Sequence, residues 1–464
     1  MIKKSIAILS LGAFFFAQGQ DTSVLRNALE VYNGSDLGTA KYNAMAGSMG
    51  ALGGEASTMT TNPAGVGVAI ASDLSATLSV SSTKNTSSLH GNSLDYKINK
   101  TDLGNVGGII SLQNRKDSDW KFINLGINFS RESVEDYAEL PGNSNITFDL
   151  TDGDRLSYSG QAFNRLGDRS KMSLGLGTNY QNRIYLGAAL HLSGLSLTQW
   201  DSAAMTYASD GATEVFSKQY TPYYEEASGF SASLGVIGKV SNEFRLGLAL
   251  ETPTWWQMDR SYQYYGLDMA DDGEYYESRS YTSPLKATLS AAYVPSKNFA
   301  LNVDYTLGLT DPKFGKMGQA AQSEMDEFFS NQYKNVSEIK VGGEYRINQL
   351  RLRAGYGYST SPTEAIALGI LQSSGQTGEA SYDNLYAGSK QRLAAGIGYD
   401  FKSFYLDAAY TNLSSTYSTP FLRGSEAAQT QYYSSSAYFA NDYAVVGEID
   451  RNQNIFTLTM GWKF

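Results

Sequence analysis

Apolar and polar residues alternate along most of the chain from Leu74 onward. In residues 299–307, for example, five apolar side chains alternate with polar or small ones, and the pattern recurs in residues 74–80, 123–129 and 244–251. A period of two residues places apolar side chains on one face of a β-strand and polar side chains on the other. The chain is therefore predicted to form a sheet with one apolar face.

Turn-forming residues divide the alternating region into fourteen predicted strands. Six connections are short and rich in Asn, Asp, Ser, Gly, Pro or Lys, as hairpin turns are: 115–119, 181–183, 241–243, 295–297, 348–349 and 402–403. They alternate with long, polar, Tyr-rich connections: 81–104, 131–171, 199–226, 257–283, 310–335, 361–390 and 417–452. The predicted strands are 73–80, 104–114, 120–130, 172–181, 184–198, 227–240, 243–256, 284–294, 298–309, 336–347, 350–360, 391–401, 404–416 and 453–464.

This order of connections is typical of bacterial outer-membrane barrels, which have an even number of antiparallel strands, short turns at one end and long loops at the other. In lipid every backbone N–H and C=O must be paired, so a spanning sheet has to close on itself. A soluble β-sandwich gives no reason for such a segregation of loop lengths. We therefore predict an all-β fold, a fourteen-stranded antiparallel transmembrane β-barrel over residues 73–464.

Aromatic residues mark the ends of two predicted strands. Residues 456–464 alternate and end on Phe464, which resembles the signal read by the outer-membrane barrel assembly machinery. Trp255 and Trp256 end a strand where a long connection begins, as expected of an interfacial aromatic girdle. We therefore expect the barrel assembly machinery to act on this chain. We also expect a monomeric barrel that is surrounded by outer-membrane lipid and lipopolysaccharide.

The first nineteen residues predict export. Lys3 and Lys4 form a basic region, residues 6–16 an apolar core, and Ala17 and Gly19 a small-x-small cleavage site. This pattern is typical of a secretory signal peptide, cleaved before Gln20. No later run approaches the roughly 18 apolar residues of a membrane helix, so we predict an outer-membrane, multi-pass protein that crosses with strands.

Composition removes most other classes of protein. The chain has 36 Lys and Arg against 46 Asp and Glu, a formal net charge of −10, and an acidic chain without basic clusters is a poor nucleic-acid binder. It contains no Cys, so thiolate chemistry is excluded. It contains only two His, too few for most metal sites or catalytic triads that use imidazole groups. We predict no cofactor, no metal site, no enzymatic activity and no nucleic-acid partner.

Residues 20–72 do not alternate and are predicted to form a segment separate from the barrel strands, rich in tight turns. They contain the Gly-rich run AMAGSMGALGGEA at 44–56, followed by Asn62, Pro63, Ala64 and Gly65. The run lacks the Lys-Ser/Thr ending of a phosphate-binding loop, and tight turns where only Gly fits are the simpler interpretation. Asn62 can bond the backbone of a tight turn and Pro63 fixes φ, so we expect these residues to set the local conformation of the segment.

These motifs resemble the start of the FadL/TodX outer-membrane transport family, in which the Asn-Pro-Ala segment belongs to an N-terminal hatch. The resemblance implies that residues 20–72 form a hatch that plugs the lumen, with Asn62, Pro63, Ala64 and Gly65 setting the conformation that closes it.

Later segments, IYLGAA at 184–189, RLGLA at 245–249 and FYLDAAY at 404–410, resemble the Bacteroidetes branch of this family. The resemblance implies passive uptake of hydrophobic compounds, such as long-chain fatty acids or aromatic hydrocarbons. It also implies ligand capture at the extracellular loops, passage to a pocket, a hatch that shifts, and lateral release through a gap made by a kinked strand. The Gly-interrupted residues 106–108 are a candidate for that kink.

Alternation assigns the polar side of the strands to the lumen. The charged positions on that side are Arg245, Glu251, Lys286, Asp304, Glu338, Lys340, Glu344, Arg346, Arg351, Arg353, Arg392 and Asp407, together with His191. One interpretation is a mutually paired network that stiffens the lumen. The other is that a cation receives the carboxylate of a ligand, and the candidates are Lys286, Arg353, Arg245 and Arg351.

A second hypothesis is that the barrel serves as a scaffold or adaptor for secretion and surface attachment, a role that other members of the same superfamily have. A continuous apolar pocket that leads to a gap in the wall favours transport, whereas a solidly plugged lumen favours the adaptor. An outer-membrane hydrolase is a third hypothesis, weakened because His191 would have to act without a serine motif.

Overall fold

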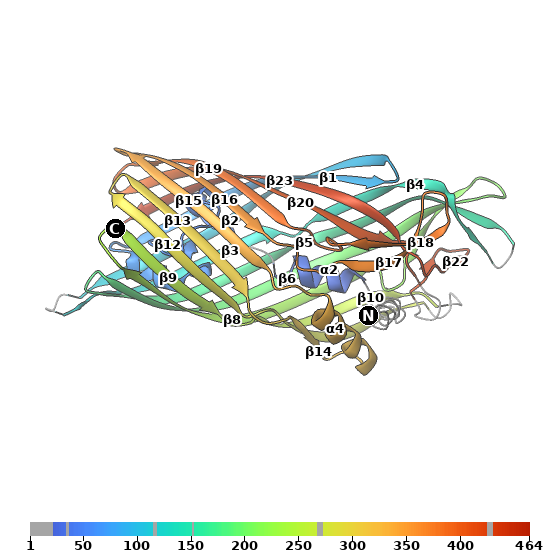
Figure 1. The fold of residues 1–464 in the computed structure, drawn as a ribbon, viewed down its shortest axis with the longest axis horizontal. Helices are drawn as coiled ribbons and strands as arrows, with labels where there is room; N and C mark the ends of the chain where they lie inside the picture. Colours follow the sequence, from blue (N-terminus) through green and yellow to red (C-terminus); the bar gives the residue numbers. More distant parts are fainter. Residues whose placement is uncertain (1–21, 34–36, 115–117, 151–152, 267–271, 425–429) are drawn as a thin grey trace, which may run out of the picture.

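The structure is a computed structural model that describes residues 22–33, 37–114, 118–150, 153–266, 272–424 and 430–464 (Figure 1). The predicted signal peptide lies outside the described residues. The helical elements are α2 (Thr22–Glu30), α3 (Ala40–Ala44), the 3-10 turns η1 (Ala56–Thr60) and η2 (Pro63–Val68), and α4 (Gln319–Asn331). None of the helices in these described ranges is long and apolar enough to cross a membrane.

Fourteen strands close into an antiparallel barrel, which confirms the predicted fold class. In chain order they are β1 (Asp73–Leu89), β2 (Asn92–Gln113), β3 (Trp120–Ser133), β5 (Arg155–Tyr180), β6 (Ile184–Tyr207), β8 (Tyr223–Lys239), β9 (Phe244–Glu251), β12 (Lys286–Ser296), β13 (Phe299–Gly308), β15 (Ser337–Ile347), β16 (Leu350–Ser359), β19 (Lys390–Asp400), β20 (Phe404–Phe421) and β23 (Val445–Lys463). Each pairs with the next, and β23 pairs with β1 to close the sheet.

Shorter strands extend the barrel or lie in its long connections. The strand begun by β9 continues, after a break at 252–254, as β10 (Trp255–Tyr264), which pairs with β8 and with β11 (Gly273–Thr282). The remaining strands are β4 (Asp136–Asp149), β7 (Thr213–Lys218), β14 (Lys313–Gly315), β17 (Ile366–Leu371), β18 (Thr377–Tyr382), β21 (Tyr432–Tyr433) and β22 (Tyr438–Phe439).

The predicted short turns are confirmed at 181–183, 241–243, 348–349 and 402–403, which each lie between two paired strands. The turn predicted at 295–297 begins two residues later, because β12 continues to Ser296, and 115–119 lies partly outside the described residues. The extent of the predicted long loops is wrong. Residues 81–104 are almost entirely strand, because β1 and β2 stay paired up to a turn at His90 and Gly91. Beyond the membrane both faces of a strand meet water or other loops, so the pattern loses its apolar alternation although the backbone pairing continues.

These extensions make the barrel wall uneven in height. Strands β5 and β6 have 26 and 24 residues, whereas β12, β13, β15, β16 and β19 have 10 or 11. In Figure 1 the yellow and orange strands β12 to β16 fill only the half of the molecule that carries the short turns and the C-terminus, while β5 and β6 continue through the other half. Over the low part of the wall, α4 and the β17–β18 hairpin take the place of strands.

The two faces of the barrel strands differ as predicted. Outward positions are exposed apolar residues such as Leu125, Leu248 and Phe456, whereas inward positions such as Asn124 and Thr459 are buried under the hatch. This arrangement suits a wall that faces lipid. The girdle prediction holds for the outward-facing Trp255 but is wrong for Trp256, which is 2% exposed, because consecutive residues of a strand point to opposite faces.

Candidate functional site

Asn62 fixes the fold of the hatch and its position on the wall. The Asn62 side chain caps η2, since its Oδ1 accepts a hydrogen bond from the Ala64 N–H at 3.0 Å. Its Nδ2 donates to the carbonyl oxygens of Gly50 at 2.8 Å and of Val236 at 3.3 Å. One amide therefore joins two turns of the hatch to strand β8, while Pro63 occupies the first position of η2, where a missing N–H costs nothing.

Glycines on the inner wall leave the space that this segment fills. A Cβ on Gly187 of β6 would lie 2.3 Å from the backbone carbon of Pro63, and a Cβ on Gly235 of β8 would lie 2.0 Å from Oδ1 of Asn62. No other residue type fits at these two positions without moving the hatch. The predicted hatch residues Asn62, Pro63, Ala64 and Gly65 are all buried in this contact.

A second hatch turn is anchored on a different part of the wall. The Gly50 N–H donates to both carboxylate oxygens of Asp304 at 3.2 Å, and the Ala51 N–H donates to Oδ1 of Asn302 at 3.2 Å. Both acceptors lie on β13. The hatch is thus held between β6 and β8 on one side and β13 on another, mostly by hydrogen bonds to backbone amides.

Helix α2 forms a second plug, nearer the long-loop end. Its Arg26 is buried and donates to Asp136 at 2.6 Å and to the Tyr417 hydroxyl. Asn27 donates to the Tyr223 hydroxyl at 2.8 Å. These partners come from β4, β20 and β8, so polar contacts in several directions hold α2 in the lumen.

The chain after α2 continues this polar anchoring. The Tyr32 hydroxyl donates to Glu225 at 2.5 Å, and Arg260 donates to the same carboxylate at 2.7 Å. The Tyr32 ring lies 5.0 Å from that of Trp256 in an edge-to-face arrangement. The inward position of Trp256 thus gives it a role in holding the N-terminal segment.

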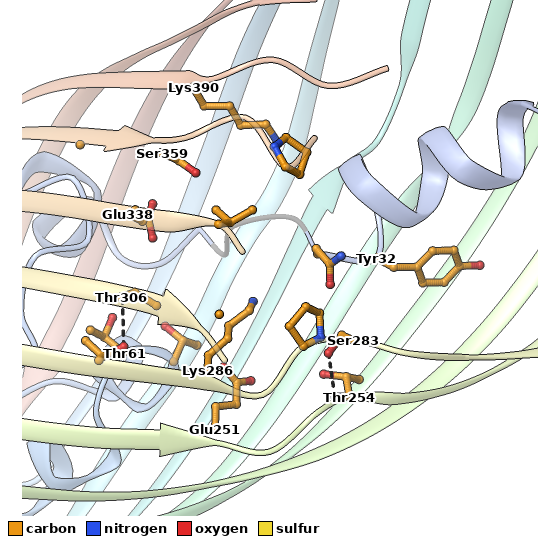
Figure 2. A pocket seen from close by; sticks show the side chains of 18 of the residues that line it. Tyr32, Thr61, Glu251, Thr254, Ser283, Lys286, Thr306, Glu338, Ser359 and Lys390 are labelled. Atoms are coloured by element: carbon orange, nitrogen blue, oxygen red, sulfur yellow. Dashed lines mark hydrogen bonds between the residues drawn. The ribbon is translucent and has the colours of Figure 1, made fainter. Parts of the chain in front are cut away.

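A cavity of about 220 Å³ lies between these two plugs. The hatch contributes Tyr42, Met59, Thr60 and Thr61, and the segment around α2 contributes Leu29, Tyr32 and Asn33. The wall contributes apolar residues and six cations against two carboxylates: Trp256, Pro284, Tyr333, Pro362, Arg169, Lys171, Lys286, Lys340, Lys390, Arg392, Glu251 and Glu338. Figure 2 shows the side chains of Lys286 and Lys390 coming from strands on two sides of this space and extending into it.

Of the four cations proposed from the sequence, Lys286 lines the cavity. Arg353 is buried and donates to Asp407 at 2.6 Å and to Glu344 at 2.7 Å. Arg351 donates to Asp400 at 2.5 Å and to Glu344 at 3.4 Å. These two arginines belong to a paired network nearer the short-turn end of the barrel, as the network interpretation expects.

The remaining predicted cation serves the hatch. Arg245 donates to the carbonyl oxygen of Leu52 at 3.3 Å. His191 is buried in the wall with its two ring nitrogens 2.8 Å from the hydroxyls of Ser173 and Ser233. Both side chains therefore have structural contacts that explain their inward positions.

Sequence reasoning missed Lys390, because the segment before residue 391 was assigned to a loop. The alternation in Lys390-Gln391-Arg392 could have identified it. Arg392 is predicted to face the lumen, and Lys390, two residues earlier in the same strand, lies on the same face. Segment 22–33 was expected to belong to the hatch, but nothing in its residues indicated that it lies across the long-loop end of the lumen.

Helix α4 covers the low part of the wall. Met325, Phe328 and Phe329 are buried in the same apolar cluster as Leu25 and Leu29 of α2. The helix and the plug therefore share one core, so the position of α4 is coupled to the closure of the lumen.

Docking of α4 is expected to weaken as pH rises. Burial raises the pKa of Glu324 to about 7, with a smaller rise from Glu327 and an opposing effect from Arg423. The docked helix favours the protonated carboxyl, so this contribution is complete below the usual pKa of 4.5 and is lost as pH passes 7. Hydrogen exchange of residues 319–331, corrected for the intrinsic pH effect, should rise between pH 5 and 8.5 and stay level in Glu324→Gln.

The exposed Glu327 supplies the matched control on the same helix. Glu327→Gln should keep the rise of exchange with pH and lower its midpoint only slightly, because Glu327 is the smallest of the causes that act on the pKa of Glu324. Equal exchange in the native chain at both pH values would show that Glu324 does not control the helix.

A closed, lipid-facing barrel with short turns at one end and a plugged lumen is a bacterial outer-membrane β-barrel. Its fold is that of solved hydrocarbon channels. The toluene transporter TodX of Pseudomonas putida is 14% identical, with a TM-score of 0.51 over 92% of this chain and 98% of that one. A Pseudomonas aeruginosa FadL homologue is 13% identical, with a TM-score of 0.56 over 92% of this chain and 98% of that one. The toluene transporter TbuX of Ralstonia pickettii is 17% identical, with a TM-score of 0.53 over 94% of this chain and 100% of that one. No family model and no curated protein matches the chain.

Proposed function

We propose that this protein is an outer-membrane channel for passive uptake of hydrophobic compounds, gated by its N-terminal segment. The observation that carries the proposal is a cavity that lies between two plugs, both of which belong to residues 22–72. The solved proteins with this fold are described as toluene transporters and as a FadL homologue, which supports the same role.

The contacts of the hatch suit a reversible gate. Neutral hydrogen bonds to backbone groups, such as those of Asn62 and Asn302, contribute about 0.5–1.5 kcal/mol each. A ligand that fills the cavity and favours a shifted hatch needs only a few kcal/mol of differential affinity to change the populations. The close contacts of the hatch with Gly187 and Gly235 define one position of the hatch in the closed state.

We further propose that outer-membrane lipid and lipopolysaccharide surround a monomeric barrel, and that the barrel assembly machinery inserts it after removal of residues 1–19. The outward apolar positions and the aromatic end at Phe464 support these proposals. The place of the chain in the Bacteroidetes branch of the family stays a prediction.

The adaptor hypothesis keeps one specific observation in its favour. Residues 106–108, the candidate for a kinked strand, pair with β1 on one side and β3 on the other, and β3 pairs with β5 over its whole length apart from one irregularity near Trp120. This part of the wall therefore has no gap in the described residues. A plugged lumen and an intact wall are what the adaptor hypothesis expects.

Uptake by cells separates the two functions. Cells that lack their own channel and produce the native protein should take up toluene or a labelled fatty acid faster than cells without it. Asn62→Ala loses the η2 cap and two hatch contacts, so it should change this rate and raise sensitivity to detergent. Asn298→Ala, in the exposed turn between β12 and β13, is the control. If the native protein gives no uptake of any hydrophobic compound, the channel proposal is wrong and the adaptor is favoured.

A further inference from the structure

Two polar groups at the α2 end of the cavity lack a hydrogen-bond partner in the described part of the chain. One is the indole N–H of Trp256, a side chain that is only 2% exposed, and the other is Oδ1 of Asn33. Both atoms are buried, and both residues line the cavity. Since buried polar groups in folded proteins are nearly always paired, these two are expected to pair with a molecule that enters the cavity.

The contacts of each side chain set its orientation. Nδ2 of Asn33 donates to the carbonyl oxygen of Ala28 at 2.8 Å, and only the amide nitrogen can make that bond, so Oδ1 is the group that stays available. A Cβ on Gly229 of β8 would lie 2.7 Å from Cδ2 and 2.8 Å from Cε3 of Trp256. These atoms lie on the side of the indole opposite Nε1, so the N–H is turned away from β8.

Both groups lie at the same end of the cavity. The Trp256 ring lies 5.0 Å from the ring of Tyr32, and Asn33 follows Tyr32 in the chain. Asn33 also donates to the hydroxyl of Tyr281 at 2.7 Å, and the Tyr281 ring lies 5.4 Å from that of Tyr32. Figure 2 shows Tyr32 and the hatch residue Thr61 on opposite sides of this space. The α2 end of the cavity therefore presents both a donor and an acceptor.

The charged side chains of the cavity compensate one another. Glu251 lies 3.4 Å from Lys171, and Glu338 lies 2.6 Å from Lys340. Lys286 lies opposite Glu251 in the register of β9 and β12. A neutral ligand leaves these pairs intact, whereas an anion has to compete with the carboxylates for the same lysines.

The size and the apolar part of the lining limit the rest of the ligand. A buried cavity of roughly 150 Å³ holds benzene, so one of about 220 Å³ accommodates a benzene ring with small substituents. Leu29 and Tyr333 line the cavity and belong to the same apolar cluster as Trp256. A hydroxyl group donates and accepts at a single atom, so it suits the two polar groups beside this surface.

We propose that the α2 end of the cavity binds a small neutral hydroxylated compound, such as an alkylphenol. Its hydroxyl accepts a hydrogen bond from Nε1 of Trp256 and donates one to Oδ1 of Asn33. A phenol is neutral at pH 7, because its pKa is about 10. The inference names a substrate class of the proposed channel and rests on that function for transport only, since binding to the purified protein is independent of it.

Equilibrium dialysis of the purified full-length protein tests the proposal, with protein-free detergent solution as the reference for uptake by micelles. The probes are para-cresol and para-xylene, which differ only by a hydroxyl in place of a methyl group. Their affinity ratio in one protein isolates the hydroxyl and cancels a change in cavity volume or in the seating of α2. Trp256→Phe removes the donor and Asn33→Leu the acceptor. Trp255→Phe, an outward-facing side chain that is 47% exposed, is the matched control.

The ratio of para-cresol to para-xylene affinity should be about fivefold higher in the native protein and Trp255→Phe than in Trp256→Phe or Asn33→Leu, the effect of one neutral hydrogen bond. A ratio that falls in only one variant overturns the role of the residue replaced in the other. An unchanged ratio in both variants, or no para-cresol binding to the native protein, overturns the site. Para-cresol binding without uptake of any hydrophobic compound by cells supports this inference and contradicts the proposed channel instead.

Discussion

Gly187→Val is expected to unseat the hatch and leave a leaking barrel. The new Cβ would lie 2.3 Å from the backbone carbon of Pro63 and 2.4 Å from the nitrogen of Ala64. Both atoms belong to the hatch backbone, so no side-chain rotation relieves the contact. Overpacking of about 1–3 kcal/mol corresponds to a shift of about 5- to 150-fold toward the unseated hatch.

The barrel itself should still form. Gly187 lies within β6, which pairs with β5 at Gly177 and with β8 at Gly235, and valine favours a strand. Heat-modifiable migration on a gel measures barrel assembly, and the rate of uptake of a small hydrophilic solute measures the leak. Gly238→Val on β8 is the matched control, because nothing lies within 4 Å of its added Cβ. Equal leakage in the two variants, or none in either, contradicts the seating role of Gly187.

The barrel could be predicted because membrane strands obey two strong constraints. Each side chain faces either lipid or the lumen, so residues such as Phe299 and Asn302 reveal their face by alternation. The extensions of β1, β2 and β5 beyond the membrane lack this constraint, and their polar sequences looked like loops. Backbone pairing between strands holds those segments, together with burial of Leu89, Leu156, Tyr158 and Phe163 in an apolar cluster that joins β1, β4, β5 and the neighbouring connections.

The candidate site was predictable only in part. Alternation placed Lys286, Arg351 and Arg353 correctly on the inner face. Whether such a cation is paired depends on residues from other strands, as with Arg353 and Asp407, which lie 54 positions apart in the sequence. The cavity itself depends on where residues 22–33 lie, and nothing in this short helix indicates that the partners of Arg26 and Asn27 come from β4, β8 and β20.

Arg26→Met is expected to release α2 from the lumen. Arg26 contacts Asp136 at 2.6 Å, Glu30 at 3.2 Å and the Phe163 ring at 4.2 Å, with a side chain only 4% exposed. Breaking a buried ion pair costs about 3–5 kcal/mol, since a charge is left without its partner. Arg451, 3.8 Å from Asp136, compensates part of this loss, so the effect should fall at the lower end of that range.

The absence of cysteine from the chain gives a direct measurement of this release. Ala28 is fully buried on α2, so Ala28→Cys introduces a single thiol that is protected while the helix is seated. In the Arg26→Met background its rate of labelling by a water-soluble thiol reagent should rise about a hundredfold. Arg131→Met removes an exposed ion pair with Asp168 and should leave the rate unchanged, because such pairs contribute about 0–1 kcal/mol. If both substitutions change the rate equally, the buried contacts of Arg26 do not hold the plug, and closure of the lumen rests on the hatch alone.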